Sequence, residues 1–280
     1  IYADLEGNLY DPFDGKKDLE LGKVEFIGDP EKRIKEDYLR ILRYIRFFLN
    51  YSKIDHKESL KKIIKQNLNG ISKISSNRLL DELEKLILSN GFLKLFKDAF
   101  SKEIIAIIFP QLINLNIFKN INDYSKKIIK EKDFIFIISL MIIDDTDNSE
   151  YFIFKYNISN KDKERIRFLS KIFSKNADKN IFNEKKLWKI FYYNGKDNLN
   201  DLIDFKIIQS KKLDKNILKL KKFFNTQEIP KLEIKAKTLI EKFNFKEGKE
   251  LGEKLKEIEE FWIENSFKIS DKELNRIIKN

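Results

Sequence analysis

The sequence predicts a mostly α-helical protein, preceded at its N-terminus by a short β segment. Apolar residues recur at helical spacing from Asp29 almost to the end of the chain, a pattern typical of amphipathic helices. The 280 residues include only four Pro and nine Gly, so few positions interrupt a helix. Short alternating segments with turn residues are confined to residues 1–28, where we expect strands and turns.

The N-terminal segment combines turn residues with one alternating stretch. Asp11 and Gly15 are typical of turns, and residues 23–27 alternate like a short strand. Asp29 and Pro30 follow as an N-cap and a first helical residue. We therefore expect one helix to begin there and to carry the arginine-rich run that follows.

That run, EDYLRILRYIRF at residues 36–47, places one carboxylate and three guanidinium groups at three-residue intervals. On a helical wheel with Asp37 at zero, the core-facing stripe falls between roughly 20° and 140°. It consists of Phe48, Ile41, Ile45, Leu49 and Leu42. Arg40, Arg43 and Arg46 fall on the opposite side, with Asp37 next to Arg40. Guanidinium groups suit nucleobases and phosphates.

Asp37 and Arg40 have the chemistry to read a nucleobase. A carboxylate only accepts hydrogen bonds and a guanidinium only donates them. Cytosine and adenine present an amine donor beside a ring-nitrogen acceptor, whereas uracil and guanine present the reverse, so this pair would admit C and A. The alternative is an i,i+3 salt bridge on a solvated helix, worth about 0.3 kcal/mol. Taken alone, the two residues favour the salt bridge.

A second charged helix is predicted from about residue 76, with Ser76 or Asn77 as its cap. Arg78, Glu82 and Lys85 stand at i,i+4 and i,i+3 spacing, so they are expected to pair along one face. Further helices are expected to the end of the chain. The predicted stops and breaks are 89–91, Pro110, 144–148 and 194–195, with a linker at 226–230.

Taken in order, these motifs resemble those of the class II tRNA nucleotidyltransferase family, the CCA-adding enzymes and bacterial poly(A) polymerases. D-x-x-x-G spans 11–15, E-D-x-x-R-x-x-R-x-x-R spans 36–46, and S-x-x-R-x-x-x-E-x-x-K spans 75–85. The match is strong to about residue 90 and thins through the middle. It returns at FKEGKELGEKL and FWI, residues 245–255 and 261–263, which are similar to the family's tail.

The resemblance implies a division into four parts. Residues 1–28 would be the remnant of a catalytic nucleotidyltransferase head. Residues 29–90 would form a helical neck that selects the nucleotide, and residues 91–225 a helical body. Residues 226–280 would form a tail that binds tRNA.

The resemblance also implies a role for each matching residue. Asp37 and Arg40 would select the base of an incoming CTP or ATP. Arg43 and Arg46 would complete nucleotide binding on phosphate. The remaining matches are Asp11 and Gly15 at a head–neck hinge, and Arg78, Glu82 and Lys85 bracing the neck. Gly248 and Gly252 would let the tail approach an RNA backbone, although close helix packing explains them equally well.

Family members begin with a head whose D-x-D pair holds two Mg²⁺ ions for phosphoryl transfer. Neither this D-x-D pair nor the head's R-R-D segment lies in the chain. Ile1 resembles the position directly after the head's R-R-D segment, so we expect an N-terminally truncated chain. The intact protein is expected to be an enzyme that adds CCA to tRNA 3′ ends from CTP and ATP, with Mg²⁺ as cofactor. These residues alone are expected not to catalyse the reaction.

Two other functions stay open at this point. A poly(A) polymerase of the same family would use ATP alone on RNA 3′ ends, and the same neck motif would serve it. The chain would alternatively be a non-catalytic helical module that binds RNA.

The composition limits the partners and the kinds of site that the chain can have. The net charge of +11 suits a polyanionic partner such as RNA, although the abundance of Lys, Ile, Asn and Phe also fits an AT-rich genome. The absence of Cys excludes disulfides, thiol catalysis and Cys-based zinc sites. No apolar run has the roughly 18 residues of a membrane span, and a bacterial-type cytosol is expected.

Most aromatic side chains are expected to lie in the core, with exceptions on the arginine-rich helix. Most of the 24 Phe fall at core spacing. Tyr44 and Phe47 instead project toward the arginine side, where Tyr44 would stack on a base or pack against a neighbouring helix. The single His, His56, adjoins Asp55 in an expected loop, so we expect it to be exposed.

Overall fold

The computed structural model describes residues 1–173, 180–210 and 212–279. Residues 174–179 and 211 of the predicted body, and residue 280 of the predicted tail, lie outside the described residues. The chain divides into two compact units, Ile1–Lys175 and Asn176–Asn280. The unit boundary falls within the predicted body, and the four-part division stays a prediction.

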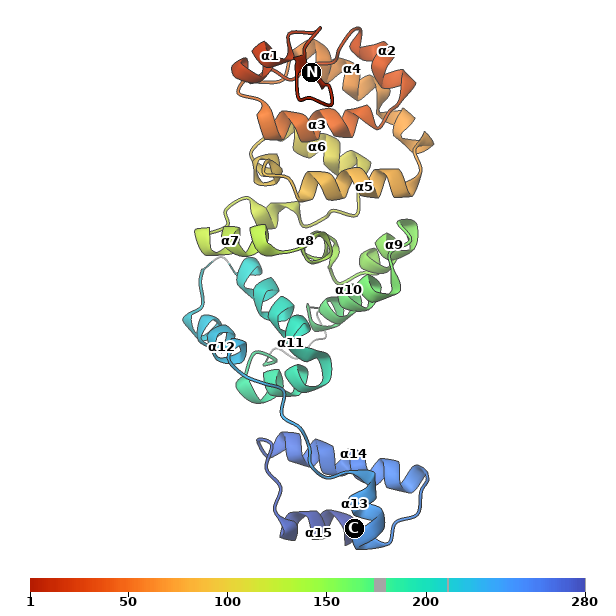
Figure 1. The fold of residues 1–280 in the computed structure, drawn as a ribbon, viewed down its shortest axis with the longest axis vertical. Helices are drawn as coiled ribbons and strands as arrows, with labels where there is room; N and C mark the ends of the chain where they lie inside the picture. Colours follow the sequence, from red (N-terminus) through yellow and green to blue (C-terminus); the bar gives the residue numbers. More distant parts are fainter. Residues whose placement is uncertain (174–179, 211, 280) are drawn as a thin grey trace. The chain divides into compact units, whose positions relative to one another are not determined.

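The first unit is helical after a small hairpin (Figure 1). Strands β1 (Tyr2–Ala3) and β2 (Leu9–Tyr10) pair antiparallel. The helices that follow are α1 (Gly15–Leu21), α2 (Pro30–Glu36), α3 (Arg40–Tyr51), α4 (Glu58–Asn67), α5 (Ser76–Ile87), α6 (Ala99–Ile108), α7 (Asp123–Glu131), α8 (Phe134–Ile142), α9 (Asn148–Lys155) and α10 (Asn160–Phe173). Three 3₁₀ turns intervene, at Leu68–Lys73, Phe92–Phe96 and Leu115–Phe118.

The second unit is also helical. It contains α11 (Glu184–Gln209), α12 (Lys215–Asn225), α13 (Ala236–Phe243), α14 (Lys249–Glu264) and α15 (Asp271–Lys279). Gly195 interrupts α11 with φ 81°, so the predicted break at 194–195 is confirmed. Residues 227–235 are neither helix nor strand, in line with the predicted linker. The mostly α fold class is therefore confirmed across the described residues.

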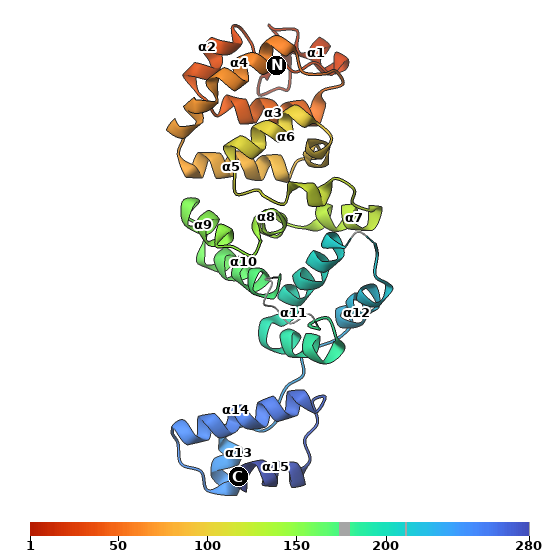
Figure 2. The same cartoon turned by 180° about the vertical axis from the view of Figure 1, so that it is seen from behind.

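Helix α3 packs against α2, α5 and the 3₁₀ turn Phe92–Phe96. Its predicted stripe is buried: Ile41, Leu42, Ile45, Phe48 and Leu49. Helices α3 and α5 lie side by side in both views (Figures 1 and 2). The predicted stop after α5 holds a glycine for a packing reason, because a Cβ on Gly91 would lie 2.6 Å from the Leu49 carbonyl carbon.

Three local predictions are wrong. Residues 23–27 form no strand, and residues 15–21, expected as turn, form α1. The cap of α5 is Ser75, whose side chain accepts from the Arg78 N–H, rather than Ser76 or Asn77.

The expected single helix through the arginine run is also wrong, since it is two helices. Asp29 caps α2 as predicted, accepting from the Lys32 N–H, but the backbone leaves the helix at Asp37. The Asp37 side chain accepts from the N–H of Leu39, two residues on, at 3.2 Å. Such local side-chain bonds compete with helical hydrogen bonds.

No helix in the described part of the chain is both long and apolar enough to span a bilayer.

Candidate functional site

The arginine run lines one hollow of the first unit, with about 350 Å³ of free space. We call it the arginine hollow. Its lining residues are Val24, Glu25, Phe26, Ile27, Arg33, Arg40, Arg43, Tyr44 and Phe47. Three guanidinium groups and three aromatic rings thus surround a space in the size range of small-ligand pockets. The arrangement suits a flat, anionic ligand, because aromatic faces stack on bases and guanidinium groups bind phosphate.

Arg40 is held in place by groups that precede it. Its Nη1 donates to the Arg33 carbonyl oxygen and to Glu36 Oε2, both at 2.6 Å. The bond from Arg40 holds the pKa of the Glu36 carboxyl below its ordinary value. Within the described residues, the Nη2 and Nε groups of Arg40 form no hydrogen bond, so they stay available to a ligand. The guanidinium is therefore oriented before any ligand arrives.

Arg33 and Glu36 were missed as site residues. Arg33 lines the arginine hollow and pairs with Glu36 at 2.5 Å. The i,i+3 and i,i+4 spacings of Glu36 to Arg33 and Arg40 were available in the sequence as a signal. Arg43 also lines the hollow, and its exposed side chain forms no hydrogen bond or ion pair within the described residues.

Asp37 lies outside the lining of the arginine hollow. Its Oδ2 pairs with Arg78 Nη2 at 2.8 Å, and its side chain is 26% exposed. The predicted side-by-side placement of Asp37 and Arg40 on one helix face is wrong, because Asp37 precedes α3 in extended backbone. The two remain linked by one backbone bond, from the Arg40 N–H to the Asp37 carbonyl oxygen.

Arg46 has a structural partner instead of a place in the arginine hollow. Its Nε donates to Glu82 Oε1 at 2.5 Å, and Glu82 is only 4% exposed. This pair joins α3 to α5. The expected pairing of Arg78, Glu82 and Lys85 along α5 is wrong, since Arg78 and Glu82 bond across to Asp37 and Arg46. Lys85 is exposed.

The predicted hinge residues form a local cap. Asp11 accepts from the Gly15 and Lys16 N–H groups, each at 2.8 Å. The bond from the Lys16 N–H leads the causes that lower the pKa of the Asp11 carboxyl. This bonding explains why a short helix starts at Gly15, and the hinge role stays a prediction.

The predicted tail glycines lie at the start of α14. Gly248 is the N-cap residue with φ 154°, and Gly252 lies one turn inside. A Cβ built on either would meet nothing within 4 Å. Close helix packing, one of the two explanations offered by the sequence, is therefore excluded for both within the described residues.

His56 is buried, so the expected exposure is wrong. It is 7% exposed, and its ring stacks on Phe48 with 3.4 Å between centroids. Its Nδ1 lies 2.8 Å from the Tyr44 hydroxyl, and its Nε2 lies 3.2 Å from Asp98 Oδ1. Tyr44 is 5% exposed and packs in the protein, whereas Phe47 is 37% exposed and faces the arginine hollow.

Asp98 is expected to make the stability of the first unit depend on pH. Burial raises the pKa of its carboxyl, but bonds from His56 and Ser101 outweigh burial and lower the pKa to about 2. A lowered folded-state pKa stabilises above the ordinary value and loses that effect as pH falls toward 2. Asp98→Asn should therefore lower the free energy of unfolding by about 2 kcal/mol at pH 7.

Urea unfolding at pH 7 and pH 3 checks this expectation. The difference between wild type and Asp98→Asn should shrink by about half at pH 3. Asp81→Asn, at an exposed position of α5, serves as the matched control and should change little. A difference that is the same at both pH values would contradict the assignment.

Two protein families match long segments of the chain. Residues 127–276 match the family described as "tRNA nucleotidyltransferase domain 2 putative". Residues 56–115 match "Probable RNA and SrmB- binding site of polymerase A". Together the two matches cover most of the chain after residue 55.

Individual relatives agree with these matches. The human "CCA tRNA nucleotidyltransferase 1, mitochondrial" is 28% identical over 300 residues. That alignment covers 100% of this chain and 63% of the relative, so the chain spans less than two thirds of the relative's length. The Bacillus stearothermophilus CCA-adding enzyme in complex with CTP has a similar fold, with a TM-score of 0.69, 17% identity and coverage of 94% of this chain and 66% of that one. The Thermotoga maritima CCA-adding enzyme complexed with tRNA gives a TM-score of 0.59 at 20% identity, covering 96% and 67%.

Proposed function

The chain belongs to the class II tRNA nucleotidyltransferase family, and we propose that it acts in adding CCA to tRNA 3′ ends from CTP and ATP. The arginine hollow carries this proposal. It combines an oriented Arg40, aromatic walls and an exposed Arg43, which has no bonded partner among the residues that the structure describes, within one ligand-sized space. Two structural neighbours are complexes of CCA-adding enzymes, one with CTP and one with tRNA.

Base selection would start from Arg40. Its free Nη2 and Nε groups donate to the ring-nitrogen acceptor of cytosine or adenine. Uracil and guanine present a ring N–H donor at the corresponding place. Two hydrogen-bond donors would then face each other, and Arg40 could not bond to the base. Arg43, and Arg33 beside it, would bind the phosphates.

Asp37 lies outside the lining of the arginine hollow, and it would accept the exocyclic amine of a base that extends past Arg40. Both of its oxygens are already bonded, one to Arg78 and one to the Leu39 N–H. Each carboxylate oxygen has a second lone pair, so one further bond fits. Arg78 would then orient Asp37 as Glu36 orients Arg40. For Arg46 the same role on phosphate would require release of Glu82.

Mg²⁺ does not fit the residues at hand. Among residues 1–173, 180–210 and 212–279, no three His, Cys, Asp or Glu side chains cluster as metal ligands do. The family resemblance implies Mg²⁺ as a cofactor, and the described residues would supply nucleotide and tRNA binding.

The tail would bind tRNA through α14, whose N-terminus is open at Gly248 and Gly252. Gly252→Ala tests this role. Alanine in an exposed helix interior should raise the stability of the second unit by about 0.5 to 1 kcal/mol. If an RNA backbone approaches here, the added methyl group should nevertheless weaken tRNA binding.

Fluorescence anisotropy with a tRNA lacking CCA measures the affinity, and thermal unfolding measures the stability. An equally long unstructured RNA is the control ligand. A variant that gains stability and keeps full tRNA affinity would show that Gly252 lies away from the RNA. Failure of the wild-type chain to prefer the tRNA over the control RNA would contradict tRNA binding as a whole.

A poly(A) polymerase of the same family is the second candidate. The match of residues 56–115 to a polymerase A region favours it. The lengths of the products that the protein makes on a tRNA substrate separate the two. CCA addition ends after three nucleotides, whereas poly(A) synthesis continues.

A further inference from the structure

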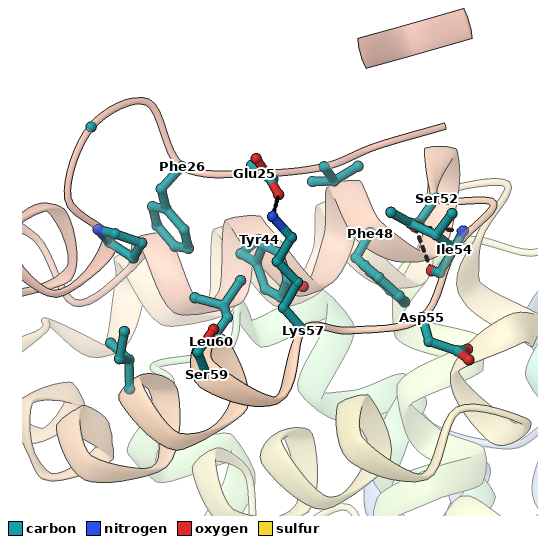
Figure 3. A pocket seen from close by; sticks show the side chains of 14 residues that line it. Glu25, Phe26, Tyr44, Phe48, Ser52, Ile54, Asp55, Lys57, Ser59 and Leu60 are labelled. Carbon is teal, nitrogen blue, oxygen red and sulfur yellow. Dashed lines mark hydrogen bonds and ion pairs between the residues drawn. The ribbon is translucent and has the colours of Figure 1, made fainter. Parts of the chain in front are cut away.

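Tyr44 takes part in two hollows of the first unit. It lines the arginine hollow, and it also lines a second cavity of about 220 Å³, which we call the inner cavity (Figure 3). Val24, Glu25 and Phe26 line both spaces as well. Tyr44 and Phe26 therefore belong to a wall that the two spaces share.

The two rings of this wall pack against each other. The Phe26 and Tyr44 centroids lie 5.6 Å apart with an interplanar angle of 21°. Figure 3 shows them next to each other, with Phe26 on the extended segment and Tyr44 on α3. Glu25, on the same segment, forms ion pairs with Lys23 and Lys57. Because the Phe26 ring packs on the ring of Tyr44, a shift of the Tyr44 ring would also move Phe26.

The hydroxyl of Tyr44 is turned away from the arginine hollow and into the protein. It lies 2.8 Å from His56 Nδ1 in a buried contact. Burial raises the pKa of the Tyr44 phenol above its ordinary value, so the group stays a neutral donor. A hydroxyl buried in this way needs a partner, because an unpaired buried donor costs free energy.

Asp98 determines which ring nitrogen of His56 donates a hydrogen bond and which one accepts. A carboxylate accepts hydrogen bonds, so His56 Nε2 carries the hydrogen that faces Asp98 Oδ1 at 3.2 Å. In this tautomer, Nδ1 presents its lone pair to the Tyr44 hydroxyl. Asp98 is itself fixed as the N-cap of α6, accepting from the Ser101 N–H at 2.6 Å.

Stacking fixes the plane of the His56 ring. The Phe48 ring lies parallel to it at 15°, and the Phe100 ring meets it edge-on with 4.8 Å between centroids. Asp98, His56 and Tyr44 therefore form one oriented chain from α6 to α3. This chain of contacts ends at Tyr44, in the aromatic wall of the arginine hollow.

We propose that His56 and Asp98 are positioning residues for nucleotide binding, which act by holding Tyr44 in place. Through Tyr44 they set the position of Phe26, so that a base beside Arg40 meets a flat aromatic wall. This inference rests on the proposed function of the arginine hollow. It predicts that side chains outside the hollow control its affinity for CTP and ATP.

His56→Phe tests the proposal with little change in volume, since it keeps a stacked ring and removes both nitrogens. Affinity of the 280-residue chain for CTP and ATP should fall about five- to tenfold, the effect of one hydrogen bond. His56→Asn places an acceptor where Nδ1 stood and should recover part of the affinity. Ile104→Val, in the core of α6, is the control for lost stability alone and should bind as wild type.

The pair His56→Phe and Tyr44→Phe gives a second test. His56→Phe leaves the Tyr44 hydroxyl buried without a partner, and Tyr44→Phe removes that hydroxyl. If the hydroxyl transmits the effect, the double variant should bind CTP more tightly than His56→Phe alone. Independent, additive losses would contradict the chain from His56 to Tyr44.

A reporter at Phe26 makes the test independent of nucleotide. Phe26→Trp adds one indole to the wall, and the same variants without this substitution allow subtraction of Trp188 and Trp262. The emission of the new Trp should shift to the red with His56→Phe or Asp98→Asn, and stay unchanged with Ile104→Val.

The outcomes separate the two hypotheses. If the wild-type chain binds CTP and ATP, and His56→Phe and Asp98→Asn change neither affinity nor emission, the positioning role is overturned and the proposed function stands. If the wild-type chain binds no nucleotide but the emission shifts, the proposed function fails and control of the wall by His56 stands. An unchanged emission in a chain that binds no nucleotide overturns both.

Discussion

Replacing Glu82 with alanine is expected to lower the free energy of unfolding of the first unit by about 2 to 3 kcal/mol. Glu82 is 4% exposed and accepts from Arg46 Nε at 2.5 Å. The Arg46 side chain is itself only 19% exposed. Truncating Glu82 leaves that guanidinium without its partner between α3 and α5, and an uncompensated buried charge is costly.

Urea unfolding monitored by circular dichroism measures this change. Glu84→Ala, two positions along on the exposed side of α5, is the matched control and should stay within about 0.5 kcal/mol of wild type. An apolar pair, Arg46→Met with Glu82→Leu, should recover much of the loss because no charge remains buried. Equal stabilities of Glu82→Ala and Glu84→Ala would rule out a bracing role.

Arg40→Ala is expected to remove the preference for CTP and ATP over UTP and GTP. A well-placed guanidinium that reads a base is worth about 1 to 3 kcal/mol of discrimination, or roughly ten- to hundredfold. Asp37→Ala should relax discrimination against UTP and GTP less completely, because Arg40 still donates to the ring nitrogen. Competition binding with all four nucleotides measures both ratios.

Two further variants sharpen this expectation. Lys62→Ala removes an exposed positive charge of α4 and should leave the ratios unchanged. Arg78→Ala should resemble Asp37→Ala, since Arg78 Nη2 orients the Asp37 carboxylate at 2.8 Å. Full C and A selectivity in the Asp37→Ala, Arg40→Ala double variant would show that other groups select the base.

Features determined by neighbouring residues could be predicted from the sequence. The Asp29 cap depends on a bond to Lys32, three positions on, and the interruption at Gly195 depends on its own φ. The buried stripe of α3 follows from apolar spacing alone. These are local effects, so the sequence carries them directly.

Features determined by distant residues could not be predicted in the same way. The position of Asp37 depends on Arg78, 41 residues later, and on its own competition with the helix. His56 is buried because Asp98 and Ser101, more than 40 residues on, bond its ring. A pattern of spacing along one helix contains no information on such partners.

The candidate site shows both cases. Arg40 and Arg43 reach the arginine hollow as the spacing indicates, and Arg46 at the same interval does not. The difference is Glu82, which comes from α5 and binds Arg46. Three equivalent arginines in the sequence thus become two groups that line the hollow and one that pairs with α5.

Calorimetric titration of the 280-residue chain with CTP, ATP, UTP and GTP, each with Mg²⁺ in low salt, tests the central claim most directly. The account predicts that CTP and ATP bind, that UTP and GTP bind at least about tenfold more weakly, and that Arg40→Ala abolishes the difference. Equal binding of all four nucleotides, or a C and A preference that survives Arg40→Ala, would contradict base selection by the arginine hollow.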